Sequence, residues 1–157
     1  MLHRTVIAFS LSAAFAAAQC PFTSVTTQSI GPSCNAASTG FCLIVQTPTQ
    51  VSPTLDTNAC TLDVEVSAFS GCGATVPVRA LAIGTLATAI PVPSFGPACT
   101  LHVAPDVLLA STGGSFLLTL PPALPPLSFV VQGFALSVPP FGAPIPTLSD
   151  GLRVDLQ

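Results

Sequence analysis

The chain has 157 residues, of which 50% are hydrophobic and 6% charged, with 17 prolines and a formal net charge of −3. Nucleic-acid binding is excluded, because Arg4, Arg79 and Arg153 are too few to form the basic face that neutralises phosphates. Ordinary disorder is excluded because it combines low hydrophobicity with high net charge, and a coiled coil is excluded because proline interrupts helices.

The first 18 residues have the features of an export signal that is cleaved off. A positive start containing Arg4 is followed by 13 residues without charge, and the last three of these are alanines. Small residues of this kind suit signal peptidase, and the apolar run is shorter than the roughly 20 residues that span a bilayer. We predict a signal helix in residues 1–18 that is cleaved between Ala18 and Gln19.

A lipoprotein signal, with Cys20 as the acylated residue, is the alternative. Gln19 argues against it, because the position before such a cysteine normally carries Gly, Ala or Ser. No later segment is long and apolar enough to cross a membrane without proline, so we expect no transmembrane span in the mature chain. The sequence therefore predicts a secreted or periplasmic protein, or one at the cell surface.

All six cysteines follow the predicted signal, at Cys20, Cys34, Cys42, Cys60, Cys72 and Cys99. An even number in an exported chain indicates a disulfide framework, for which six cysteines allow 15 connectivities. Zinc binding is the competing interpretation, but the chain lacks a CxxC pair and the mature part has one histidine, His102. We expect no metal and no other cofactor, and we predict the sequential pairs Cys20–Cys34, Cys42–Cys60 and Cys72–Cys99.

Alternation of apolar and polar residues predicts strands at 61–69 and at the C-terminus from residue 152. A hairpin is expected in which residues 50–55 pair with residues 60–66. Its turn, 56–59, contains Asp and Asn, whose side chains bond to nearby backbone groups. Further strands are expected at 75–83, 99–103, 115–120 and 128–138, and the last two are continuously apolar, as in central strands covered on both faces.

Turn signals recur at intervals of roughly 8–12 residues, which is typical of antiparallel sandwiches and barrels. We predict an all-β, antiparallel β-sandwich, Ig-like or jelly-roll-like and stapled by disulfides. Three regions are expected: the signal peptide 1–18, a loop-rich lead-in 19–48 pinned by cysteines, and the sandwich domain 49–157.

His102 and Asp106 are the candidates for a small hydrolase of the Ser-His-Asp type. Two features argue against this reading. His102 lies where a strand runs into a proline turn and is expected to face solvent, and the chain has no G-x-S-x-G elbow to expose a serine. We therefore predict no catalytic residue and no enzymatic activity.

Asp63 and Glu65 are the close pair of carboxylates, two residues apart on a predicted strand. A glycosidase pair normally flanks a cleft from different elements, so a solvated sheet face is the better interpretation. Calcium is an alternative, either at Asp56 and Asn58 or at Asp63 and Glu65, although it needs six to eight oxygen ligands.

A chain with so few charges covers its surface with Ser, Thr, Pro, Gly and Ala, and we expect an apolar patch among them. Such a surface favours association with an envelope protein, a polysaccharide or another copy, although a neutral exterior also suits a secreted setting by itself. We predict a secreted, non-catalytic structural or adhesion module. The alternative is an extracellular sandwich that binds a small ligand in a cleft lined by phenylalanine.

A resemblance covers roughly residues 50–157 and depends on the order and spacing of short segments. Those segments are 55–69, 70–73, 81–84, 90–93, 96–101, 105–109, 129–133 and 148–152. In these, the chain resembles small secreted proteins and C-terminal modules of unknown function that are common in planctomycete-type bacteria. The resemblance implies an exported β-sandwich and supplies no site residues. Relatives often have adjacent cysteines where this chain has Cys72-Gly73.

Overall fold

The computed structural model describes residues 19–35, 49–68, 73–141 and 143–157. The predicted signal helix, together with Cys42 and Cys72, lies outside these ranges. Within them the regular structure is antiparallel β, apart from one short 3-10 turn, η1 (Pro93–Phe95). The predicted all-β, antiparallel class is therefore confirmed.

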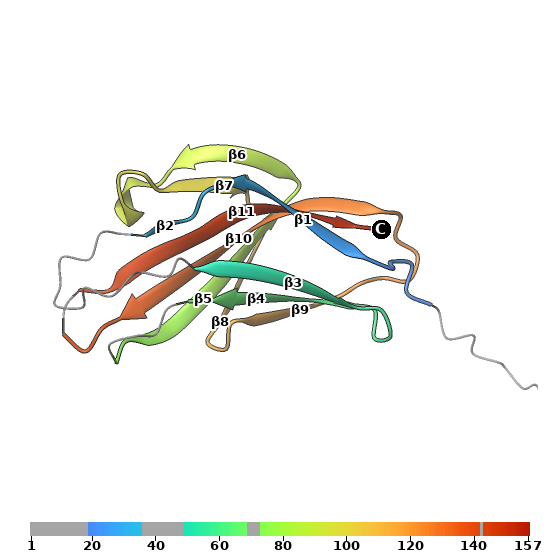
Figure 1. Ribbon diagram of the computed structural model, residues 1–157, viewed down its shortest axis with the longest axis horizontal. Coiled ribbons are helices and arrows are strands. Elements are labelled where there is room, and N and C mark those ends of the chain that lie inside the picture. Colours follow the sequence, from blue (N-terminus) through green and yellow to red (C-terminus); the bar gives the residue numbers. More distant parts are fainter. Residues whose placement is uncertain (1–18, 36–48, 69–72, 142) are drawn as a thin grey trace, which may run out of the picture.

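The strands form three layers (Figure 1). The larger sheet has the order β1-β11-β10-β5-β8, and the short β2 pairs with β11. Its strands are β1 (Val25–Gly31), β2 (Cys34–Asn35), β5 (Thr75–Gly84), β8 (Val107–Ser111), β10 (Leu127–Val138) and β11 (Ile145–Leu156). The smaller sheet is β3 (Gln50–Asp56), β4 (Thr61–Ser67) and β9 (Ser115–Thr119), and the third layer is the hairpin of β6 (Leu86–Pro91) and β7 (Thr100–Ala104).

The main core lies between the two sheets. Apolar and polar residues alternate along β4, and the apolar residues are its contribution to this core. Leu62, Val64 and Val66 are buried, while the residues between them are not. Burying side chains of this size stabilises the fold by about 1.5–3 kcal/mol each. The full core cluster is Phe22, Val51, Leu62, Val64, Val66, Leu81, Phe116, Leu120, Phe129, Val131, Val154 and Leu156.

Strand β10 is covered on both faces, as its continuous apolar sequence predicts. Phe129 and Val131 belong to the core between the sheets, while Val130 packs with Ala82 and Val103 under the hairpin layer. The same prediction was wrong for β9, because β9 ends the smaller sheet. Its apolar run gives one buried phenylalanine, Phe116, and leaves Leu117 66% exposed.

The lead-in 19–48 was expected to be loop-like, and this was wrong for β1. This strand pairs along β11, from Val25 opposite Leu156 to Gly31 opposite Gly151. Its sequence, VTTQSIG, contains few apolar residues because most of its side chains are exposed at the edge of the sheet. A strand of this kind has no alternating pattern by which the sequence could reveal it.

Two disulfides join the described cysteines, Cys20 to Cys60 and Cys34 to Cys99, with Cα–Cα distances of 5.0 and 5.2 Å. The sequential pairs Cys20–Cys34, Cys42–Cys60 and Cys72–Cys99 were therefore wrong. Strand β1 lies between Cys20 and Cys34, and its 7 residues span about 23 Å. A disulfide needs Cα atoms closer than about 7 Å, so β1 holds these two cysteines too far apart to pair.

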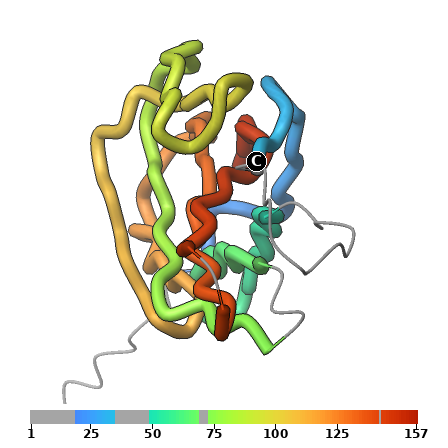
Figure 2. The backbone as a smooth tube through the Cα atoms, turned by 90° about the vertical axis from the view of Figure 1, so that its left-hand side faces the viewer, coloured from blue at the N-terminus to red at the C-terminus, as the bar shows by residue number. Residues whose placement is uncertain are grey.

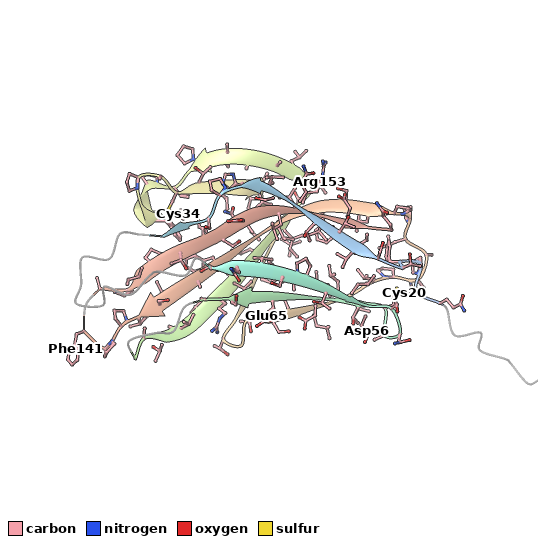
Figure 3. All side chains as sticks on the ribbon, viewed as in Figure 1. Cys20, Cys34, Asp56, Glu65, Phe141 and Arg153 are labelled. Atoms are coloured by element: carbon pink, nitrogen blue, oxygen red, sulfur yellow. A yellow bond between two sulfur atoms is a disulfide. The ribbon has the colours of Figure 1, made fainter. Side chains whose placement is uncertain are left out.

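Figure 2, turned by 90°, shows the gold segment that includes β8 running along one side of the molecule. Figure 3 places Cys20 and Cys34 toward opposite ends of the molecule.

Disulfides are compatible with an oxidising compartment. Among the residues that the structure describes, no helix is long and apolar enough to cross a bilayer.

Candidate functional site

His102 lies in β7, and its side chain is buried, with 8% of its surface exposed. The expectation that it faces solvent was wrong. The β6–β7 hairpin lies over the outer face of the larger sheet, and His102 and Val103, which both belong to this third layer, are buried against that sheet. A sequence pattern that places β7 at the surface of a two-layer sandwich does not reveal this extra layer.

The His102 ring packs against two glycines of the larger sheet. Gly31 in β1 and Gly151 in β11 lie opposite each other, where the register of the two strands shifts. A Cβ atom on Gly31 would overlap the imidazole ring, and one on Gly151 would overlap the Cβ of His102. The missing side chains therefore allow β7 to approach the sheet closely.

Gln132, which is 1% exposed, joins the hairpin layer to the larger sheet. Its Oε1 accepts a hydrogen bond of 2.7 Å from the backbone N–H of His102. Its Nε2 donates to the carbonyl oxygens of Thr100 at 3.2 Å and Ser149 at 2.9 Å. The buried amide of Gln132 thus links the hairpin layer to the larger sheet, where no strand pairing between the described residues joins the two.

The structure does not assemble a hydrogen-bonded Ser-His-Asp arrangement from the described residues. The buried Nε2 of His102 has no hydrogen-bond partner among them. The Asp106 carboxylate instead accepts hydrogen bonds from the backbone N–H of Thr85 at 2.9 Å and from its hydroxyl at 3.1 Å. Asp106 therefore fixes the turn between β5 and β6.

Asp63 and Glu65 lie on the outer face of the smaller sheet, as the interpretation of a solvated face predicts. The Ser115 hydroxyl donates to Asp63 at 2.7 Å, across the β4–β9 pair. The carboxylate of Asp56 accepts from the backbone N–H groups of Asn58 and Ala59 at 2.8 and 3.1 Å, and so closes the predicted hairpin turn. The described residues contain no group of three or more His, Cys, Asp or Glu side chains suited to a metal ion.

The remaining candidate for a functional feature is the protein surface, because large apolar side chains are exposed on all three layers. Leu108 and Phe141 are 70% and 92% exposed, and Phe141 lies at the end of the molecule opposite Cys20 (Figure 3). Within the described ranges these exposed residues are Val78, Leu86, Ile90, Val107, Leu108, Leu117, Leu127 and Phe141. The sequence predicted an apolar surface from the low charge, but it did not identify these positions.

No protein-family model, curated protein or solved structure matches the chain.

Proposed function

We propose that the protein is exported and acts as a non-catalytic structural or adhesion module in the cell envelope. It binds an envelope protein, a polysaccharide or another copy of itself. The observation that carries the proposal is the set of large apolar side chains that remain exposed on a scaffold cross-linked by disulfides.

Exposed apolar side chains favour association because water covers them in the free protein. Leu86, on the hairpin layer, is 68% exposed, and Leu117, on the smaller sheet, is 66% exposed. Removing a leucine or phenylalanine of this kind from water on binding contributes about 1.5–3 kcal/mol when burial is complete.

The disulfides support a role in a rigid extracellular scaffold. Cys20–Cys60 joins the segment before β1 to the turn of the smaller sheet, and Cys34–Cys99 joins the segment after β1 to the chain entering β7. All three layers are therefore covalently linked through the β1 segment. A rigid surface loses little conformational entropy on binding. The proposal also agrees with what the resemblance to exported planctomycete-type modules implies.

The test is retention of envelope components by the immobilised, oxidised protein. A triple variant, Leu86→Ser, Leu108→Ser and Leu117→Ser, removes one exposed apolar group from each layer, β8 included, without touching the core. The matched control replaces three exposed polar residues, by Thr26→Ala, Thr54→Ala and Thr119→Ala.

We expect the wild-type and control proteins to retain the same protein, polysaccharide or second copy, and the serine variant to lose most of it. Retention no greater than on bare resin would contradict the proposal. So would equal retention by all three proteins.

A further inference from the structure

Strand β8 ends the larger sheet, and among the described residues its strand pairing is to β5 alone. The register runs from Val107 opposite Ile83 to Ser111 opposite Arg79, without a shift. The backbone groups on the far side of β8 therefore have no strand partner in the described part of the chain. An edge of this kind can pair with a strand of another molecule.

The sequence of β8, VLLAS, contains no charged residue and no proline. Val107 is 47% and Leu108 70% exposed. Three other end strands carry features that hinder edge pairing. Strand β3 contains Pro53, β6 ends at Pro91 beside a register shift, and β1 has a register shift near Gly31.

Charge complementarity distinguishes β8 from β9, whose sequence SFLLT is also uncharged. Asp106 precedes β8, and Thr112 follows it. The Arg79 guanidinium donates a hydrogen bond of 2.9 Å to the carbonyl oxygen of Thr112. A negative group therefore lies at the beginning of β8 and a positive group at its end. When two such strands run antiparallel, each end meets the opposite charge.

We propose that two copies of the protein pair antiparallel through β8, about a two-fold axis at Leu109. Val107 then lies opposite Ser111 of the other copy, and Leu108 lies opposite Ala110. Asp106 of each copy then lies opposite Thr112 of the other copy, next to the Arg79 guanidinium that binds that Thr112. The inference rests on the proposed function and names its partner as a second copy of the chain.

The self-pairing satisfies the symmetry that dimers require, because each contact occurs twice around the axis. No like charges face each other, since the five paired residues carry none. A pairing of five residues is small, so the dimer belongs to the weak, concentration-dependent class. In the two Asp106–Arg79 pairs Asp106 is exposed and Arg79 is half-buried, and salt therefore weakens the association.

The test is the oligomeric state of the oxidised protein, measured by sedimentation velocity from about 1 μM to about 1 mM. Leu108→Lys places a charge on the edge strand, one residue from the two-fold axis at Leu109. Leu117→Lys is the matched control, because Leu117 is equally exposed at 66%, in the middle of β9. Leu108→Lys should raise the dissociation constant of the dimer by about tenfold or more, and Leu117→Lys should change it by less than about twofold.

Ala110→Lys is the second variant, for the case in which Leu108→Lys does not fold, because Ala110 is also exposed. A wild-type protein that stays monomeric to the highest concentration would overturn the pairing. A dimer that resists both β8 variants, or one that Leu117→Lys disrupts, would also overturn it. A monomer that still retains an envelope component would refute the self-pairing and leave the proposed function in place. A β8 dimer without any envelope partner would support the self-pairing and remove the other partners.

Discussion

The side chain of Gln132 and the backbone of His102 are joined by a buried hydrogen bond of 2.7 Å between Oε1 and N–H. Gln132 lies in β10, at the centre of the larger sheet, while His102 lies in the hairpin outside it. The hydrogen bond therefore connects two layers that are not paired as strands.

Gln132→Ala should destabilise the fold by about 3 kcal/mol, because it leaves the His102 N–H and the Thr100 and Ser149 carbonyls without their partner. The measurement is chemical denaturation of the oxidised protein. Gln28→Ala, at an exposed position of β1, is the control and should change stability by less than about 0.5 kcal/mol. Equal effects of the two variants would show that the buried amide does not hold the hairpin layer.

Gly151→Ala should destabilise the fold by about 1–3 kcal/mol, because the new methyl group would overlap the Cβ of His102. Gly113→Ala is the matched control, since its Cβ would meet only the Ser111 hydroxyl, at 3.7 Å. Thermal unfolding of both variants measures the difference. A Gly151→Ala protein as stable as the Gly113→Ala protein would contradict the close packing of β7 on the sheet.

The sequence predicted those strands in which buried positions carry apolar side chains and exposed positions carry polar ones. The hairpin of β3 and β4 was confirmed, because Leu62 and Val64 alternate with polar residues and Asp56 supplies the turn. Strand β10 was confirmed because both of its faces are covered, which requires a continuous apolar sequence.

Strands β1, β2, β6 and β8 were missed because their positions depend on tertiary pairing. In β6 the side chain of Leu86 is 68% exposed, and in β8 that of Leu108 is 70% exposed. The apolar residues of these strands therefore do not mark a buried face. The environment of His102 was missed for a related reason. Its burial depends on the glycines at 31 and 151, which lie 71 and 49 residues away along the chain.

Peptide mapping of the oxidised protein should recover Cys20 linked to Cys60 and Cys34 linked to Cys99. Replacing Cys34 and Cys99 together by Ala should cost about 4 kcal/mol, because the disulfide closes a segment with a sequence separation of 65. Pepsin digestion at low pH limits thiol exchange during the mapping. Recovery of Cys20 linked to Cys34 would contradict the described arrangement around β1.

Asp106→Ala should destabilise the turn between β5 and β6 by about 1 kcal/mol, because the backbone N–H and the hydroxyl of Thr85 both donate to its carboxylate. Asp106→Asn is the matched control, since the amide oxygen can accept the same hydrogen bonds, and it should retain most of the stability. Denaturation at about 1 μM protein keeps association through β8 from contributing. The structural role of Asp106 requires Ala to be clearly less stable than Asn, and two equally stable variants would refute it.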